Sequence, residues 1–128
     1  MNNVDVVVLD LDGGVMLAEC LASIAQQSVQ PARVIVFDNG SRVPVSNRMT
    51  TGAFEVVRSD TNLGFAGGAN AALVQSTSSY VALVNNDVVL DPEWLASVTG
   101  ALDRDERLAA VQTIIRRPDG LIDGAGID

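Results

Sequence analysis

Apolar residues gather in short runs that alternate with segments of helical periodicity. Three of these runs have the pattern of strands buried on both faces of a sheet, and they cover Val4–Leu9, Arg33–Phe37 and Tyr80–Val84. A shorter run at Phe54–Val57 predicts a strand nearer an edge, and Leu108–Ile115 predicts a further strand. Strands that alternate with helices indicate an α/β fold with a mostly parallel sheet and helices on both of its faces.

The segments between these runs predict helices and loops. The first helix extends to about Gln27, which lies outside its apolar stripe, and the second covers Ala66–Ser76. A third helix follows the capping sequence Asp91–Glu93. The polar segment Ser41–Gly52 predicts a loop, and Leu121–Ile122 predicts a short returning strand. Because no repeat or linker interrupts the pattern, residues 1–128 predict a single domain.

The charged residues exclude several kinds of chemistry. The chain has no histidine and no lysine, and its 16 acidic residues against 8 arginines give a net charge of −8. Catalytic triads with histidine, P-loops and Schiff-base sites are therefore excluded within it, and a single Cys20 excludes a disulfide framework. Such an acidic chain should repel nucleic acid. An anionic ligand would need a metal ion, helix N-termini or local arginines.

Aspartates follow three of the predicted strands. Asp10 and Asp12 follow the first strand, Asp38 follows the second, and Asp87 follows the Tyr80–Val84 strand. The carboxyl ends of parallel strands meet at one edge, where open α/β sheets bind ligands. Carboxylates gathered there would repel one another unless a divalent cation neutralised them. A single aspartate in a turn needs no functional explanation, so it is the shared position that favours a ligand site.

The second helix starts in a glycine-rich segment. Asn62–Asn70 holds three glycines and two asparagines. Residues without side chains let a bulky ligand approach the backbone at the start of a helix. A flexible turn followed by close packing of helix on sheet gives the same pattern, and the spacing alone does not decide between the two.

Three segments, taken in order, resemble the family 2 glycosyltransferases of the GT-A fold. They are Val34–Ser41, Asn62–Asn70 and Val84–Val88. The similarity covers essentially the whole chain and is closest to the bacterial rhamnosyltransferase-like branch, which builds cell-wall and surface polysaccharides. It implies a GT-A half-domain that binds a nucleotide-diphospho-sugar for inverting transfer to a saccharide or lipid-linked acceptor. It also implies a cytoplasmic location, with the full-length enzyme at the inner face of the cell membrane.

The resemblance implies roles for individual residues. Asp38 would accept a hydrogen bond from a ring N–H of the base, beside a pocket lined by Leu9, Asp10 and Leu11. The residues that would shape the nucleotide-sugar pocket are Asn62, Gly64, Gly68 and Asn70. Asn85, Asn86 and Asp87 occupy the position of the family's DxD motif. There Asn85 would face the ribose, and Asp87 would bind Mg²⁺ or Mn²⁺ that bridges the donor diphosphate.

The sequence departs from the family pattern in three places. Asp10-Leu11-Asp12 stands where the family usually has a pair similar to Tyr-Asn, and Asp87 is the one acid in the DxD position. The family's acceptor-binding region and general base lie further along the chain. The resemblance therefore predicts that they come after Asp128 and that this chain is the donor-binding part, so no general base is assigned.

Two alternatives remain open at this point. The segment Val7–Val15 resembles the first motif of haloacid dehalogenase-like phosphatases, in which Asp10 would be the nucleophile and Asp12 the general acid and base. The chain could instead bind a nucleotide sugar without catalysing its transfer.

Overall fold

A computed structural model describes residues 3–48 and 52–125 of the protein. The chain forms two compact units, Met1–Leu95 and Ala96–Asp128. The expectation of a single domain stays a prediction.

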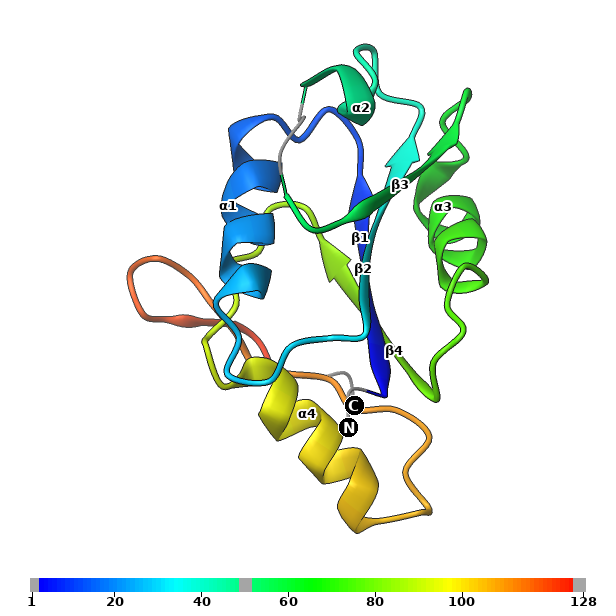
Figure 1. Ribbon diagram of the computed structural model, residues 1–128. Coiled ribbons are helices and arrows are strands. Elements are labelled where there is room, and N and C mark those ends of the chain that lie inside the picture. Colours follow the sequence, from blue (N-terminus) through cyan, green and yellow to red (C-terminus); the bar gives the residue numbers. More distant parts are fainter. Residues whose placement is uncertain (1–2, 49–51, 126–128) are drawn as a thin grey trace. The chain divides into compact units, whose positions relative to one another are not determined.

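The first unit is built on a four-stranded parallel sheet (Figure 1). Its strands are β1 (Val4–Asp10), β2 (Arg33–Asn39), β3 (Glu55–Ser59) and β4 (Tyr80–Asn85), in the order β3-β2-β1-β4. β1 pairs in parallel with β2 and β4, and β2 pairs in parallel with β3. The four strands expected here and their parallel arrangement are confirmed, and β3 lies at an edge as its shorter run predicts.

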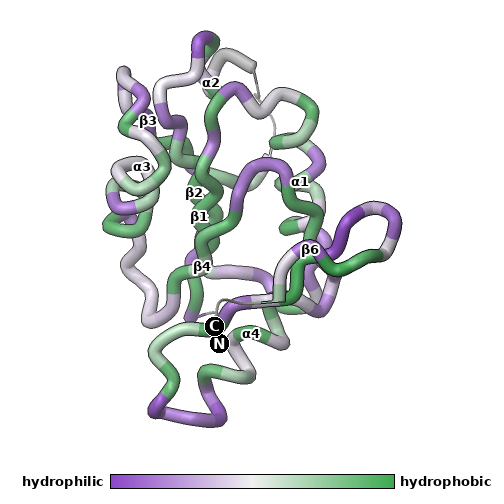
Figure 2. The backbone as a smooth tube through the Cα atoms, turned by 180° about the vertical axis from the view of Figure 1, so that it is seen from behind, coloured by the Kyte–Doolittle hydropathy of each residue, from purple (hydrophilic) through white to green (hydrophobic). Residues whose placement is uncertain are grey.

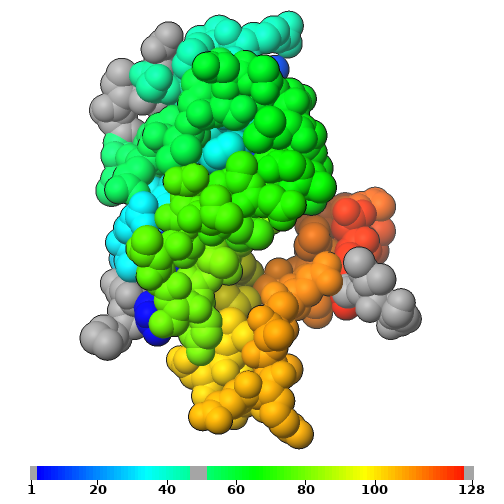
Figure 3. All heavy atoms as spheres, turned by 90° about the vertical axis from the view of Figure 1, so that its right-hand side faces the viewer, coloured from blue at the N-terminus to red at the C-terminus, as the bar shows by residue number. Residues whose placement is uncertain are grey.

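Helices cover both faces of this sheet. α1 (Val15–Ala25) and α3 (Gly64–Leu73) lie on opposite sides of it in Figure 1. Every residue of β1 is buried, and the tube in Figure 2 is hydrophobic along much of β1 and β2. Figure 3 shows α3 and its neighbouring segments covering one face of this unit. The core under α3 is formed by Val7, Leu9, Ile35, Phe37, Ala69 and Ala72.

Two polar side chains of α1 hold the segment that follows β4. The Ser23 hydroxyl accepts a hydrogen bond from the backbone N–H of Leu90 at 3.1 Å. The Gln27 amide donates to the Asp91 carbonyl at 2.7 Å and accepts from the Leu95 N–H at 2.9 Å. The sequence places Gln27 outside the apolar stripe of the helix, and this prediction is wrong because Gln27 is buried. Its side chain is buried because its amide forms hydrogen bonds with the backbone of residues 91 and 95. These hydrogen bonds attach residues 90–95, which follow residues 85–87 along the chain, to α1.

The second unit departs most from expectation. It contains most of α4 (Trp94–Arg104) and an antiparallel pair of β5 (Ile115–Arg116) and β6 (Ile122–Gly124). The expected strand Leu108–Ile115 is wrong over most of its length, because strand structure begins only at Ile115. Its apolar side chains lie exposed, so the burial that such a run predicts is not realised here. The short returning strand expected at Leu121–Ile122 is present as β6, which begins at Ile122 and extends to Gly124.

The segment Ser41–Gly52, which was expected to be a loop, contains one short helix, α2 (Val45–Arg48). Residues 49–51 of this segment lie outside the described residues. Within the described ranges, no helix is both long enough and apolar enough to cross a bilayer.

Candidate functional site

A row of polar residues crosses the carboxyl edge of the sheet. Asp10 of β1 is the register partner of Asp38 in β2, and Asp38 is the partner of Arg58 in β3. Asn86 follows the last residue of β4 and joins the row from the other side. Residues in register on neighbouring strands point to the same face of a sheet, so parallel pairing brings these side chains together.

Asp38 is fully buried and receives three N–H donors. Its Oδ1 accepts from the Ser41 N–H at 2.9 Å. Its Oδ2 accepts from the Val45 N–H at 2.9 Å and from Arg58 Nη1 at 2.7 Å. Burial alone would raise the pKa of Asp38, but the donors of Val45, Ser41 and Arg58 hold that pKa below its usual range. Asp38 is therefore a carboxylate that organises the loop after β2.

Asp10 is also fully buried and links the loops after β2 and β4. Its Oδ1 accepts from Asn86 Nδ2 at 2.9 Å, and its Oδ2 accepts from the Ser41 hydroxyl at 3.4 Å. A side chain at Gly13 would collide with this pair, because its Cβ would lie 2.7 Å from Asn86 Nδ2 and closer still to Asp10 Oδ1. Gly13 therefore leaves the space in which Asp10 and Asn86 meet.

Protein donors, rather than a gathered metal site, satisfy the carboxylates of the first two strands. Asp12 accepts from the Arg42 N–H at 2.9 Å, and its own N–H donates to the Ser41 hydroxyl at 2.9 Å. Among the described residues, no group of three or more Asp, Glu, Cys or His side chains is placed to hold a metal ion. The expected meeting of Asp10 and Asp38 at one edge is found, but Arg58, Asn86, Ser41 and backbone N–H groups supply the compensation expected of a cation.

The segment after β4 presents an exposed acid at this edge, as Asp12 does after β1. Asn85 and Asp87 are exposed, whereas Asn86 is half-buried. The Cys20 thiol on α1 donates to the Asn85 carbonyl at 3.6 Å. Burial, followed by the negative charges of Asp87 and Asp10, raises the pKa of this thiol to about 11. Both carboxylates are thus close enough to one thiol for their charges to act on it.

Asn39 joins the end of β2 to the start of α3. Its Oδ1 accepts from the Leu63 N–H at 3.0 Å, and its Nδ2 donates to the Gly64 carbonyl at 3.1 Å. The Asn62 side chain caps the same turn by accepting from the Gly64 N–H at 2.8 Å. At Gly68 a Cβ would lie 2.6 Å from Asn39 Nδ2, so a glycine is needed there for close packing of α3 on β2.

The expected pocket residues therefore do not form a single cluster. Leu9 is a core residue under α3, while Leu11 is exposed. Asn70 is exposed on α3, and no hydrogen bond described for residues 3–48 and 52–125 joins its side chain to the others. Asp10, Asp38 and Asn86 belong to the polar row, whereas Asn62, Gly64 and Gly68 gather around Asn39.

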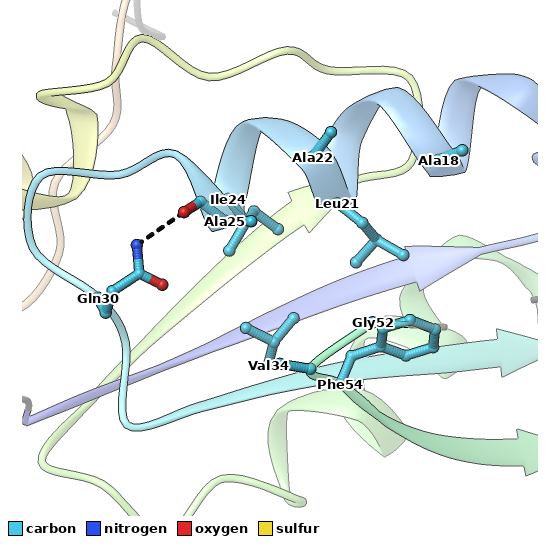
Figure 4. A pocket seen from close by; sticks show the side chains of 10 residues that line it. Ala18, Leu21, Ala22, Ile24, Ala25, Gln30, Val34, Gly52 and Phe54 are labelled. Carbon is cyan, nitrogen blue, oxygen red and sulfur yellow. Dashed lines mark hydrogen bonds between the residues drawn. The ribbon is translucent and has the colours of Figure 1, made fainter. Parts of the chain in front are cut away.

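A pocket of about 240 Å³ lies away from this edge (Figure 4). Leu21 and Ala22 of α1, Val34 of β2 and Phe54 before β3 line it. Gln30 also borders it and donates to the Ala25 carbonyl at 3.1 Å. Its lining, within the described residues, carries no charged side chain, so it does not suit a diphosphate.

Sequence reasoning missed the residues that connect the site. Ser41 contacts Asp10, Asp12 and Asp38 at once, and Arg58 completes the shell of Asp38. The sequence pointed to local arginines as possible cations but selected none of the eight. The available signal was register: Arg58 occupies the same level of its strand as Asp38 does in the next.

Comparison with known proteins decides the family. Residues 12–124 match the profile described as glycosyl transferase family 2. The chain belongs to this family. Over 102 residues it is 35% identical to "Uncharacterized protein y4gI" of Sinorhizobium fredii, a match that covers 73% of this chain and 11% of that protein.

Solved structures with the same fold include TarS of S. aureus. The full TarS chain matches with a TM-score of 0.65 and 24% identity over 79% of this family 2 chain and 19% of TarS. TarS 1-349 in complex with UDP-GlcNAc gives a TM-score of 0.67 and 24% identity, covering 79% of this chain and 31% of that one. The likeness shows the GT-A arrangement of sheet and helices. The chain spans less than one third of the length of these relatives.

Proposed function

We propose that this chain is the donor-binding part of an inverting glycosyltransferase and that it binds a nucleotide-diphospho-sugar at the carboxyl edge of the sheet. One observation carries the proposal: membership of the family coincides with a polar row at this edge and an exposed aspartate, Asp87, at its end. Ligands of open α/β sheets bind at this edge. TarS supports the choice of ligand class, because its solved complexes hold UDP and UDP-GlcNAc.

The residues at this edge suit a divalent cation that is shared with a substrate. Mg²⁺ commonly takes one or two carboxylates together with substrate phosphates and water, rather than a cage made by protein alone. Asp87 offers one exposed carboxylate and Asn85 one exposed amide. Bound Mg²⁺ or Mn²⁺ would stabilise negative charge on the departing nucleoside diphosphate. Asn86, held by Asp10 at 2.9 Å, fixes the backbone from which Asp87 projects.

The remainder of the reaction is proposed for the longer protein. An acceptor hydroxyl would attack the anomeric carbon with inversion, and a general base beyond Asp128 would take its proton. The acceptor would be a saccharide or a lipid-linked sugar, as in the rhamnosyltransferase-like branch, and the complete enzyme would work at the inner face of the cell membrane. A chain with this part alone would bind the donor without transferring its sugar. Incubation with a donor labelled in its sugar distinguishes a catalytic chain, which releases the labelled sugar, from a chain that only binds the donor.

The phosphatase alternative is disfavoured by the structure. A phosphatase nucleophile must reach a phosphorus atom, whereas Asp10 is fully buried and accepts from Asn86 and Ser41. The Asp12 carboxylate accepts instead from Arg42.

The test is a thermal-shift series with nucleoside diphosphates, with and without Mn²⁺. A ligand that binds the folded state raises the unfolding temperature, and part of that rise should require Mn²⁺. Asp87→Ala should remove the Mn²⁺-dependent part, while Glu106→Ala, which removes an exposed acid from the second unit, should keep it. If the rise in unfolding temperature is the same with and without Mn²⁺ in the unmodified chain and in Asp87→Ala, the role of Asp87 is contradicted. No shift with any nucleotide would contradict donor binding.

A further inference from the structure

The loop that follows β4 carries Asp87 and has no helix or strand of its own from residue 86 to residue 93. In Figure 1 the chain leaves β4 and passes beside α1, and hydrogen bonds join the two segments. A loop without regular structure depends on other parts of the molecule to satisfy and fix its backbone groups. The side chains of α1 that face this loop therefore determine where the Asp87 carboxylate lies.

Cys20 of α1 contacts the backbone on both sides of Asp87. Its thiol donates to the Asn85 carbonyl at 3.6 Å, and the Val88 N–H donates to its sulfur. Each contact is weak, because a thiol is a weak donor and a weak acceptor. The Cys20 side chain is fully buried, so water does not compete for these two contacts. The backbone is thus held immediately before and after the pair Asn86–Asp87.

Ser23 lies one turn further along α1, on the same buried face as Cys20. Its hydroxyl donates to the Cys20 carbonyl at 2.7 Å and accepts from the Leu90 N–H at 3.1 Å. Gln27, just after the helix, continues this line through its hydrogen bonds with the backbone of residues 91 and 95. The three side chains therefore hold the loop in order, from residue 85 to residue 95.

The position of this loop matters because Asp87 is the one acid in the place of the family's DxD motif. Mg²⁺ requires near-ideal octahedral geometry, with its oxygen ligands at about 2.1 Å. If the loop were mobile, it would have to become ordered when the cation binds, and the lost conformational entropy would lower the affinity. A loop that is already fixed avoids this loss.

We propose that Cys20 and Ser23 are positioning residues for metal-dependent donor binding, because they hold the loop after β4 so that Asp87 meets a cation shared with the donor diphosphate. This inference rests on the proposed function and deepens it. Cys20 is 0% exposed and Ser23 is 7% exposed, so neither side chain can contact the donor. Both act through the backbone that carries Asp87.

The experiment measures how much Mn²⁺ strengthens nucleotide binding. Dissociation constants of UDP, GDP and thymidine diphosphate are measured with Mn²⁺ and with EDTA for the unmodified chain, Cys20→Ala and Ser23→Ala. In the unmodified chain Mn²⁺ should tighten at least one nucleotide about tenfold, and each variant should lose most of this factor while its metal-independent binding changes little. A loss of folded protein alone would weaken both measurements equally and would leave their ratio unchanged.

Ser76→Ala is the matched control. It removes a partly buried hydroxyl that donates to Asp5 Oδ2 at 2.9 Å, away from the loop after β4, so the Mn²⁺ factor should survive. Ser23→Thr should also keep the factor, because a threonine hydroxyl in a helix can still bond the carbonyl three residues earlier. Ser23→Cys, which has a weaker acceptor of similar size, serves as the test should both alanine variants fail to fold.

Two further measurements show whether the effect passes through the loop and Asp87. In the Asp87→Ala background, which lacks the carboxylate, Ser23→Ala should cause no further loss of the Mn²⁺ factor. Hydrogen exchange of the Leu90 amide, measured without metal or nucleotide, should be about tenfold faster in Ser23→Ala and unchanged in Asp87→Ala.

The outcomes distinguish this inference from the function on which it rests. A Mn²⁺ factor that survives in Cys20→Ala or in Ser23→Ala overturns the role of that residue and leaves donor binding intact, and an equal loss in Ser76→Ala overturns both roles. If Mn²⁺ tightens no nucleotide in the unmodified chain, the proposed role of the cation fails and this inference fails with it. Failure of every nucleotide to bind overturns the proposed function itself.

Discussion

The two ends of the sheet each contain a fully buried aspartate, and they use it differently. Near the amino ends of the strands, Asp5 is 0% exposed. Its Oδ2 accepts from the Ser76 hydroxyl at 2.9 Å and the Thr77 N–H at 3.0 Å, and its Oδ1 accepts from the Ser78 hydroxyl at 2.9 Å. These donors come from the loop between α3 and β4, and Arg33 Nη1 of β2 forms an ion pair with Asp5 Oδ2 at 3.6 Å. Asp5 therefore ties one loop and one arginine of the neighbouring strand to β1.

The aspartates at the carboxyl end have partners from several loops. Asp10 accepts hydrogen bonds from Asn86 after β4 and from Ser41 after β2. Asp38 accepts from Arg58 of β3 and from the Ser41 N–H, so Ser41 connects the two aspartates. This network also reaches side chains open to solvent, Arg58 and Asp87 among them. The comparison shows that a buried, well-satisfied acid is not by itself a sign of function. What marks the carboxyl end is that two buried acids share Ser41 and hold several loops at the edge where open α/β sheets bind ligands.

The largest expected effect comes from breaking the amino end. Asp5→Ala leaves the Thr77 N–H and two serine hydroxyls without their acceptor, so the free energy of unfolding should fall by about 3 kcal/mol. Urea denaturation measures this loss. If the amino end is only structural, the protein that remains folded should bind a nucleoside diphosphate with unchanged affinity.

A loss of affinity that matches the loss of stability would remove the distinction between the two ends. Glu106→Ala, an exposed acid outside the first unit, is the control and should leave both quantities nearly unchanged.

A smaller effect is expected from crowding the carboxyl end. In Gly13→Ala the new Cβ would lie 2.7 Å from Asn86 Nδ2, so the Asn86–Asp10 hydrogen bond must break or the loop must move. We expect a loss of about 2 kcal/mol in unfolding free energy together with weaker nucleotide binding. Loss of stability with unchanged affinity would show that this loop does not position the ligand site.

The same substitution in an open helical position provides the control. Gly100→Ala in α4 meets only the flexible end of Arg104, at 3.4 Å. It should raise the unfolding free energy by about 0.5 to 1 kcal/mol through helix propensity.

Much of this fold follows from the sequence because strand burial leaves a direct pattern. The runs of Val, Ile and Leu in β1, β2 and β4 predict strands covered on both faces, and the structure buries β1 completely. The expectation is wrong for β4, which lies at an edge of the sheet and buries only Val84 of its six residues. The glycine-rich start of α3 was also readable, although the helix begins at Gly64 and ends at Leu73, earlier at both ends than the expected Ala66–Ser76. In the second unit the same reasoning failed at Leu108, because an apolar run predicts a strand only where a surface is available to cover it.

The site was less readable because its key contacts depend on register and on polar burial. Arg58 becomes a partner of Asp38 only when β3 pairs with β2 at one particular offset, which no local pattern encodes. Gln27 resembles a surface residue in sequence, yet its amide binds the backbone of residues 91 and 95. Asp10 and Asp87 were correctly placed at the same edge, but the hydrogen bond from the Asn86 amide to Asp10 could be found only in the structure.

The smallest effect we expect is a pH dependence that both ends share. Burial alone would raise the pKa of Asp5, but hydrogen bonds from Thr77, Ser78 and Ser76 hold that pKa below its usual range, as the donors around Asp38 do there. A group with a lowered pKa binds fewer protons in the folded state than in the unfolded one. Its stabilisation is fully present above the unfolded pKa of about 4, and it is lost as the pH falls through the folded pKa.

Unfolding in urea between about pH 3 and pH 7 should therefore show stability rising with pH in the acid range. Asp5→Asn and Asp38→Asn should each flatten this rise, since neither amide can ionise. The two ends separate when the affinity for a nucleoside diphosphate is measured over the same range. Protonation of Asp38 weakens its hold on the loop after β2, so the affinity should fall in acid and should fall less in Asp38→Asn. Asp5→Asn should keep the acid loss, and an identical response of the two variants would mean that the carboxyl end, like the amino end, only closes its loops.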